Sequence, residues 1–398
     1  MSNSSFQKQL TKAFKNALVF LSFIFTGLNC SGHKISNSEF LNLDFKEFIT
    51  ISLNNNATNS WLYHQIFNLN NGSKYMVIQN PFPMNPNRLF LNSLEEKEKN
   101  IELIFDVEGP NGVGNVTDFY LHNFDSIFLV DRYSYLLSLV DSSGKVKLSY
   151  RLKKSEGNKP DEVSSLPFTL KGRDIRLADG SIYIPTVPDI DPYQNAYKNK
   201  NLIVKVDLSD GKIEYLLGYP TSFGNEFLGG PDHFLPSITA FRNPNEFLIS
   251  YPTSDSVYFF DAKNDVLRKM FISKSDFVEN IKSPNPQNWE YEDRTRHQLE
   301  TPRHALVIFD QFREKIYRIS LGGFDDESVD KIMKNSKVTP RKASLNVHDI
   351  TGRLISTHVI DTRNYDPFDI IVLENGLYLG ENSNKSENEK TFYKIAFD

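Results

Sequence analysis

The stretch Lys205-Val-Asp-Leu-Ser-Asp-Gly-Lys-Ile213 is an apolar strand that ends in an acidic residue, turns through polar residues and glycine, and returns as a second strand. An Asp side chain accepts hydrogen bonds from turn amides, and Gly or Asn takes up positive φ, so the stretch predicts a β-hairpin. The same pattern recurs at Leu139-Val-Asp-Ser-Ser-Gly-Lys-Val146, Phe259-Phe-Asp-Ala-Lys-Asn-Asp-Val266 and Val347-His-Asp-Ile-Thr-Gly-Arg-Leu354. Repetition of one hairpin along the chain is typical of β-propeller blades.

Further strands precede each hairpin. Apolar segments lie at 125–130, 180–184, 245–251 and 304–309, and a still earlier short strand is visible at 116–122 and 235–241. Four strands in a unit of about 40 to 50 residues are the sequence signature of a propeller blade. The units fall at residues 61–106, 114–152, 172–218, 234–273, 302–362 and 367–398.

The last unit is one strand short, and the N-terminal segment Phe48–Leu53 can supply the missing outer strand. Such closure removes the sheet edges that would otherwise pair with other chains. We therefore predict an all-β fold: a single β-propeller of six four-stranded blades, with its ring closed by an N-terminal strand.

Helical patterns are scarce. We predict two short helices between strands, at Ser275–Ile281 and at Asp326–Asn335, and the second opens with acidic and closes with basic residues, as the helix dipole favours. Residues 283–301 form the longest stretch without a strand pattern, and we predict a loop there on one propeller face. Long loops often carry function, so this loop is a functional candidate.

The N-terminus has the three parts of an export signal: Lys8, Lys12 and Lys15, an apolar run from Ala17 to Leu28, and Cys30. A membrane span needs roughly 20 apolar residues, so this run is short for the alternative of an anchor helix. We predict a signal peptide at 1–29, a polar tether at 30–38 and the propeller domain at 39–398.

Cys30 is the only cysteine of the chain, so it cannot form an intramolecular disulfide. Its segment resembles the lipobox of bacterial lipoproteins, although Gly27 and Asn29 depart from the Leu and the small residue usual at those places. We predict lipidation at Cys30, against the alternative of a free cysteine near a conventional cleavage site. Acyl chains would hold the protein on the outer membrane, facing the periplasm or the cell surface.

Three stretches carry a family resemblance: Glu108-Gly-Pro-Asn-Gly-Val-Gly114, the strand pair region 119–128, and Leu139-Val-Asp-Ser-Ser-Gly-Lys145. Together they resemble the bacterial domain-of-unknown-function 4221 family (DUF4221), from about residue 40 to the end of the chain. The resemblance implies a lipoprotein with a propeller-like domain. It implies no catalytic or binding residue.

The composition and net charge indicate which classes of partner to expect. With a net charge of −5 and a pI near 6.0, the chain has no basic excess, and its Lys and Arg residues are scattered. We therefore expect no nucleic-acid partner. The 39% of apolar residues suffices for a large core, and the 24% of charged residues is too high for a membrane-embedded protein.

Motifs for cofactors and catalysis are missing. The glycines of Gly109–Gly114 precede a strand instead of opening a helix, and Asp189-Ile-Asp191 lacks the later ligands of a calcium loop. There is no Walker loop, no His-Glu-x-x-His and no Gly-x-Ser-x-Gly. We predict no cofactor, no catalytic residue and no metal ligand, while a cation assembled from separate blades remains open.

Two groups of residues are candidates for ligand binding. The first is Asp131-Arg132-Tyr133, where Arg can clamp a carboxylate or a sugar acid, or form a bridge to an Asp between blades. The second is the polar cluster in the predicted loop, which either lines a pocket at the tunnel mouth or is a solvated, salt-bridged loop. Its members are Trp289, Tyr291, Arg294, Arg296, His297, Arg303 and His304.

From these features we predict a membrane-tethered binding or scaffold module for a peptide, glycan or protein partner. The alternative is a propeller enzyme of lactonase or lyase type, with metal or acid residues contributed across blades. A cluster of acidic side chains facing the axis would favour the enzyme, and a packed, apolar or plainly basic axis would argue against a metal enzyme.

Overall fold

The computed structural model describes residues 41–81, 84, 86–152, 165–189, 201–220, 223, 231–243, 245–279, 281, 290–334, 340–382 and 386–397. The expected signal peptide, the whole of the predicted tether with Cys30, and Trp289 lie outside these residues. Among the residues that are described, no helix is long and apolar enough to cross a membrane.

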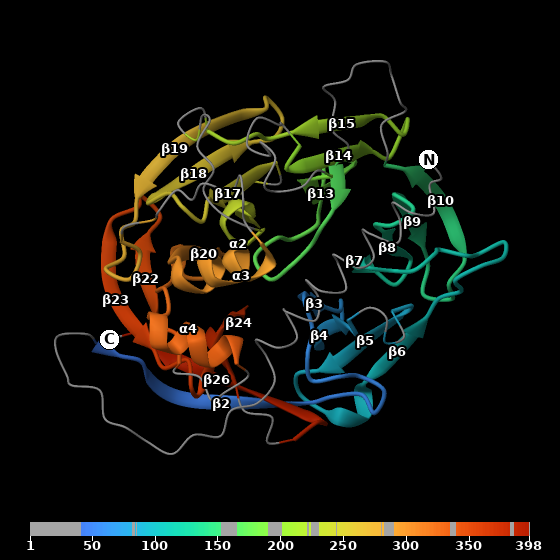
Figure 1. Cartoon of the computed structure of the whole chain (residues 1–398). Coiled ribbons are helices and arrows are strands. Elements are labelled where there is room, and N and C mark those ends of the chain that lie inside the picture. Colours follow the sequence, from blue (N-terminus) through green and yellow to red (C-terminus); the bar gives the residue numbers. More distant parts are fainter. Residues whose placement is uncertain are drawn as a thin grey trace.

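Six β-sheets stand around a central axis, as Figure 1 shows, and the predicted six-bladed propeller is confirmed. The first blade contains β3 (His64–Asn68), β4 (Lys74–Gln79), β5 (Arg88–Ser93) and β6 (Ile101–Ile104), with a 3-10 turn, η1 (Lys97–Lys99), before β6. The second contains β7 (Asp118–Asn123), β8 (Ser126–Asp131), β9 (Leu136–Val140) and β10 (Val146–Arg151). The third contains β11 (Ser165–Pro167), β12 (Arg176–Ala178), β13 (Ser181–Pro188), β14 (Ile203–Asp207) and β15 (Ile213–Leu216).

The remaining blades follow in chain order. The fourth contains β16 (Ser237–Ala240), β17 (Glu246–Ser250), β18 (Ser256–Asp261) and β19 (Val266–Ile272). The fifth contains β20 (Arg303–Asp310), β21 (Lys315–Leu321), β22 (Ala343–Asp349) and β23 (Leu354–Ile360). The sixth contains β24 (Tyr365–Leu373), β25 (Gly376–Glu381) and β26 (Glu389–Ala396). In the first, second and fourth blades, successive strands are antiparallel neighbours in one four-stranded sheet.

The N-terminal segment closes the ring. Strand β2 (Asp44–Ser52) pairs antiparallel with β26, from Asp44 opposite Ala396 to Ser52 opposite Glu389, and is the fourth strand of the sixth blade. Just before it, β1 (Leu41–Asn42) adds in parallel to β23 of the fifth blade. The prediction for residues 48–53 is therefore confirmed.

The four repeated hairpins form as the sequence predicts. In each, the backbone N–H two residues after the Asp donates to its carboxylate, at 2.9 Å for Asp141, 2.8 Å for Asp207, 3.0 Å for Asp261 and 2.9 Å for Asp349. The third copy has no glycine, and Asp265 takes the left-handed conformation there, with φ 52°. Each Asp thus fixes a tight outer turn.

The core lies between neighbouring blades, where flat sheets pack through apolar and aromatic side chains. The rings of Tyr63 and Phe119 join the first and second blades at 5.2 Å, and those of Phe241 and Phe309 join the fourth and fifth at 4.8 Å. Such tilted aromatic contacts add to the hydrophobic gain of burial.

Two of the expectations outside the strands were wrong. The described part of Ser275–Ile281 contains only a turn, because the Ser275 hydroxyl lies 2.9 Å from that of Ser344 on β22 and holds the segment against the fifth blade. Within the predicted loop, residues Tyr291–Glu300 form the helix α3, whose start is capped by a bond from the Glu290 N–H to Asp293 Oδ2 at 3.0 Å. The predicted helix near 326 is confirmed as α4 (Asp326–Met333), and α2 (Pro231–Phe234) is a single turn.

Candidate functional site

A segment of the third blade lies at the centre of the ring. Residues Phe168–Asp174, here called the axial segment, connect β11 to β12 and reach the middle of the molecule (Figure 1). The Lys171 N–H donates to Leu62 O in the first blade at 2.9 Å, and Ile238 of the fourth blade donates to Gly172 O at 2.7 Å. The axial segment therefore links blades that are not neighbours.

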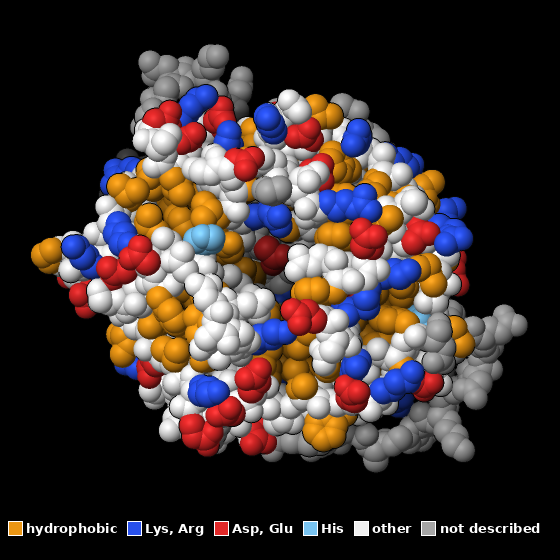
Figure 2. All heavy atoms as spheres, turned by 180° about the vertical axis from the view of Figure 1, so that it is seen from behind, with side chains coloured by type: hydrophobic (Ala, Val, Ile, Leu, Met, Phe, Trp, Pro, Cys, Tyr) orange, Lys and Arg blue, Asp and Glu red, His pale blue; other side chains and the backbone are white. Residues whose placement is uncertain are grey.

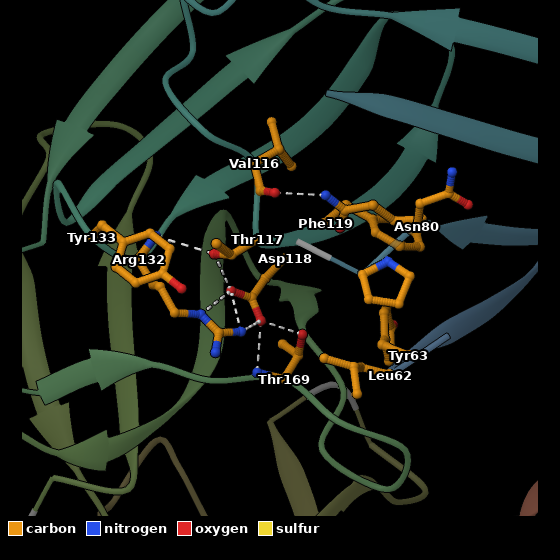
Figure 3. Close-up of a pocket in the computed structure, with 12 residues that line it drawn as sticks. Leu62, Tyr63, Asn80, Val116, Thr117, Asp118, Phe119, Arg132, Tyr133 and Thr169 are labelled. Atoms are coloured by element: carbon orange, nitrogen blue, oxygen red, sulfur yellow. Dashed lines mark hydrogen bonds and ion pairs between the residues drawn. The ribbon is translucent and has the colours of Figure 1, made fainter. Parts of the chain in front are cut away.

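A pocket lies between the first two blades and this segment, with about 490 Å³ of space including its open part. Figure 3 shows the lining residues. They are Leu62, Tyr63, Gln79, Asn80, Pro81, Val116, Thr117, Asp118, Phe119, Arg132, Tyr133 and Thr169.

The floor of the pocket is a buried ion pair. Arg132 Nη2 lies 2.9 Å from Asp118 Oδ1 and 3.0 Å from Oδ2, with Nε at 3.3 Å from Oδ2. Asp118 also accepts from the Thr117 hydroxyl at 2.6 Å and from the Thr169 N–H at 2.8 Å, so its oxygens are saturated. The guanidinium rests on the Phe168 ring, 4.6 Å from its centre.

The Nη1 edge of the Arg132 guanidinium stays available to a ligand. Within the described part of the chain, its Nη1 group donates no hydrogen bond, because Asp118 takes Nε and Nη2. Figure 3 shows the Tyr133 ring beside this guanidinium, and Tyr133 is 45% exposed. A charged donor and an aromatic face therefore meet at the opening of the pocket.

Lys171 of the axial segment meets a second set of charges in the sixth blade, Asp366 and Asp369 on β24 and Lys390 on β26. These four residues are here called the axial cluster. Lys171 Nζ lies 3.4 Å from Asp366 Oδ2 and closer still to Asp369, while Lys390 Nζ lies 2.8 Å from Asp369 Oδ2. The Trp61 ring faces both ammonium groups, at 6.0 Å and 5.6 Å. Two positive and two negative groups thus balance at the centre of the ring.

The pKa values follow from this balance. Burial alone would raise the pKa of Asp369, but the ammonium groups of Lys171 and Lys390 outweigh it and hold that pKa below its usual value. Burial raises the pKa of Asp366 against the attraction of Lys171. His64, beside them, has its pKa lowered by burial to about 4, so its ring is neutral at pH 7.

Asp174 ends the axial segment without an ion-pair partner among the described residues. Burial raises its pKa to about 6, and its nearest hydrogen-bond partner is the Thr239 hydroxyl at 3.4 Å. Figure 2 shows that the face opposite the helices of Figure 1 is hollowed at the ring centre, with acidic and basic side chains around and within the hollow.

The residues of the first predicted group, Asp131, Arg132 and Tyr133, have two different roles. Arg132 and Tyr133 line the pocket, whereas Asp131 fixes the turn that contains them by accepting from the Tyr133 N–H at 3.0 Å and the Ser134 hydroxyl at 2.7 Å. The expected bridge from Arg to Asp exists, but it lies within the second blade and not between blades, because Asp118 stands on the strand next to Arg132.

The second predicted group lies elsewhere, around α3 and the start of β20. Tyr291 is 58% exposed on α3, and Arg296 pairs with Glu300 at 3.1 Å and with Asp330 of α4. His304 is buried between the Ser320 hydroxyl at 2.8 Å and Asp255 Oδ1 at 3.1 Å, and burial lowers its pKa to about 3. Members of this group, which also holds Arg294, His297 and Arg303, do not line the pocket of Arg132.

Sequence reasoning missed Thr169, Lys171, Asp366, Asp369 and Lys390. No spacing could have found them, since Lys171 and Asp366 are 195 residues apart and meet only because the ring closes. As to metals, the described residues contain no group of three or more His, Cys, Asp or Glu side chains placed to hold an ion.

The comparisons with known proteins agree on the fold. A family model described as a domain of unknown function (DUF4221) matches residues 38–349, and no curated protein matches the sequence. A solved DUF4221 structure from Bacteroides vulgatus is similar with a TM-score of 0.72 and 16% identity, over 89% of this chain and 98% of that one. A Bacteroides fragilis protein, whose name proposes export, is similar with a TM-score of 0.52 and 12% identity, over 89% and 96%.

Proposed function

This chain belongs to the DUF4221 family, and from that premise we propose that it is an exported lipoprotein whose propeller is a binding or scaffold module. It is tethered to the outer membrane through an acylated Cys30 and takes part of a peptide, glycan or protein partner into the pocket of Arg132. The single observation that carries the binding role is the meeting of Arg132 Nη1 with the exposed Tyr133 ring at the pocket opening.

The location is supported by the N-terminal sequence, with its three lysines, its short apolar run and Cys30. The export named for the similar Bacteroides fragilis protein is consistent with it. Metabolic labelling with an alkyne fatty acid tests the tether: label should appear on the intact protein and disappear in Cys30→Ala. Protease shaving of whole cells then tells which side of the membrane the propeller faces.

The chemistry of the pocket sets what it can hold. Because Asp118 neutralises Arg132, the pocket has little net charge, and Nη1 can serve any acceptor oxygen, whether carbonyl, carboxylate or sugar hydroxyl. The Tyr133 ring offers an apolar face for a sugar or a side chain to stack on. This combination suits a single protruding group of a larger partner.

Tyr133→Ala is the sharpest test, because it removes the aromatic wall and leaves the buried pair intact. Tyr291→Ala is the matched control, since Tyr291 is also an exposed tyrosine but lies on α3, away from the pocket. On glycan and peptide arrays, the wild-type protein and Tyr291→Ala should retain the same ligands and Tyr133→Ala should lose them. Equal binding by all three proteins would remove the pocket from the proposal.

One observation favours an acid–base enzyme as the second candidate. The Asp174 carboxyl, with its pKa raised by burial to about 6, can exchange protons near neutral pH. Turnover of lactones or of uronate sugars by the wild-type protein and not by Asp174→Asn would establish this candidate. Turnover by neither protein would favour the binding module.

A further inference from the structure

A group of basic side chains, buried or half-buried, lies away from the pocket, and we call it the arginine cluster: His233, Arg303 and Arg341, with Asp232. Asp232 and His233 stand on α2, Arg303 opens β20, and Arg341 lies two residues before the start of β22. The cluster therefore lies near the segments through which the chain enters the fourth and fifth blades. Sequence analysis singled out Arg303 alone of these four.

The cluster has more positive than negative charge. Arg303 Nη2 lies 2.8 Å from Asp232 Oδ2, which is the one carboxylate that pairs with it among the described residues. Arg341 donates only to neutral carbonyls, from Nε to Gly322 O at 2.6 Å and from Nη2 to Thr301 O at 3.1 Å. Burial lowers the pKa of Arg341 well below its usual value, and the neighbouring charge of Arg303 lowers it further.

Two buried polar atoms in the cluster have no hydrogen-bond partner among the residues that the structure describes: Arg303 Nη1 and His233 Nδ1. Arg303 is only 8% exposed and His233 is fully buried. His233 Nε2 lies 3.4 Å from Thr301 O, which accepts and does not donate, so the neutral ring carries its proton on Nε2 and leaves Nδ1 as an acceptor. A donor on β20 and an acceptor on α2 are thus left without partners among the described residues.

Two other buried arginines, Arg318 and Arg173, are satisfied by the fold itself. Arg318 donates from Nε to the Ser250 hydroxyl at 3.1 Å and from Nη1 to Asp255 O and Ser273 O, both at 2.7 Å. Arg173 likewise uses Nε, Nη1 and Nη2 on three backbone carbonyls. An unpaired buried donor is costly, so the free Nη1 of Arg303 calls for a group that the described residues do not supply.

We propose that the arginine cluster is a binding site for an oxyanion, a carboxylate or phosphate group of a ligand. One oxygen of the oxyanion accepts from Arg303 Nη1, and Arg341 supplies the second positive charge. A protonated oxygen, as in hydrogen phosphate, can donate to His233 Nδ1. The Asp232 side chain is 37% exposed, so the cluster reaches the surface from the side of α2. This site is independent of the pocket of Arg132.

Calorimetric titration of the full chain with phosphate, sulfate and acetate, with ionic strength held constant by sodium chloride, tests the site. The wild-type protein should bind at least one of these oxyanions saturably. Arg303→Gln should bind it about tenfold or more weakly, because a charge-assisted hydrogen bond is lost. The control Arg296→Gln removes an arginine that already has two carboxylate partners, and its affinity should match the wild type.

Asp232→Asn gives a second readout that does not depend on the folding of Arg303→Gln. Asp232 competes with the oxyanion for the guanidinium, so its removal should tighten binding severalfold. Tighter binding by Asp232→Asn together with weaker binding by Arg303→Gln supports the site. The absence of saturable binding in both the wild type and Asp232→Asn overturns it, as does unchanged affinity in both variants.

Discussion

The axial cluster and the arginine cluster bury charge in opposite ways. In the axial cluster, two lysines face two aspartates, and every ammonium group meets a carboxylate. In the arginine cluster, the one carboxylate pairs with Arg303 and not with Arg341, and the buried Arg303 Nη1 has no hydrogen-bond partner among the described residues. Burying a charge costs several kcal/mol unless it is paired and hydrogen-bonded. The first arrangement balances its own charges, whereas the second keeps an excess of positive charge that an anion would neutralise.

The two clusters also differ in what they join. Lys171 reaches from the third blade to Asp366 and Asp369 in the sixth, so the axial cluster ties blades on opposite sides of the ring. The arginine cluster joins the connections around the fourth and fifth blades only. We infer that the axial cluster serves the stability of the ring, whereas the arginine cluster serves a ligand.

Removing Asp369 should produce the largest effect on stability. Asp369→Asn leaves Lys171 and Lys390 buried beside a neutral amide, and breaking a buried pair typically costs about 3–5 kcal/mol. Denaturation by urea measures the loss. Asp366→Asn is the matched control and should cost less, because burial already raises the pKa of Asp366 and Lys171 lies farther from it, at 3.4 Å. Equal losses in both variants would show that Asp369 is not the centre of the cluster.

The next prediction concerns the packing of the axial segment at Gly172. Gly172 has φ +77°, and a Cβ there would lie 2.5 Å from Leu306 Cδ2 and 2.8 Å from Ser237 Oγ. Gly180 has nearly the same φ, +75°, but a Cβ there would meet nothing within 4 Å. Gly180→Ala should therefore cost only the backbone strain, about 1 kcal/mol. Gly172→Ala should cost about 2–3 kcal/mol, because the clash adds to the strain. Equal midpoints of thermal unfolding would mean that the axial segment is not tightly packed.

The fold was largely predictable because it repeats. Each of the hairpins at Asp141, Asp207, Asp261 and Asp349 is a local structure, fixed by an Asp side chain and its own turn amides. Local patterns of this kind can be found in a single sequence, and six units at regular spacing imply a closed ring. The N-terminal strand followed from the one strand missing in the last unit.

The site was less predictable, because it depends on contacts between distant residues. Arg132 and Tyr133 were found since a turn sequence placed them at a strand end, but Thr169 and Lys171 carry no motif and act only through Asp118, Asp366 and Asp369. Helix α3 was missed because its sequence is polar throughout, with only Thr295 and Leu299 buried, and so lacks the apolar stripe that marks a helix.

The pH dependence of stability sharpens the contrast between paired and unpaired carboxylates. Asp174 has no ion-pair partner among the described residues, and burial raises its pKa to about 6. The folded protein therefore holds a proton that the unfolded chain has lost between about pH 4 and pH 6, and stability falls as the pH rises through this window.

Asp174→Asn should remove that loss. Relative to the wild type, the variant should gain about 1–2 kcal/mol at pH 7 and nothing near pH 4, since the half-buried carboxyl realises only part of its shift. Urea denaturation at a series of pH values from 4 to 7 gives the difference curve. If the difference in unfolding free energy between the two proteins does not change with pH, the ionised Asp174 carboxylate is as well stabilised in the folded protein as in water.

Arg303→Gln should have the smallest effect, although Arg303 is as deeply buried as the axial lysines. Its partner Asp232 is 37% exposed and regains water when the guanidinium leaves, so the pair contributes about 1 kcal/mol or less. The substitution also removes the repulsion between Arg303 and Arg341 and the unpartnered Nη1. Urea denaturation without oxyanions should therefore show a loss far below that of Asp369→Asn. A loss as large as that of Asp369→Asn would mean that Arg303 stabilises the ring in the same way as the axial cluster. It would then argue against a role for Arg303 in binding an anion.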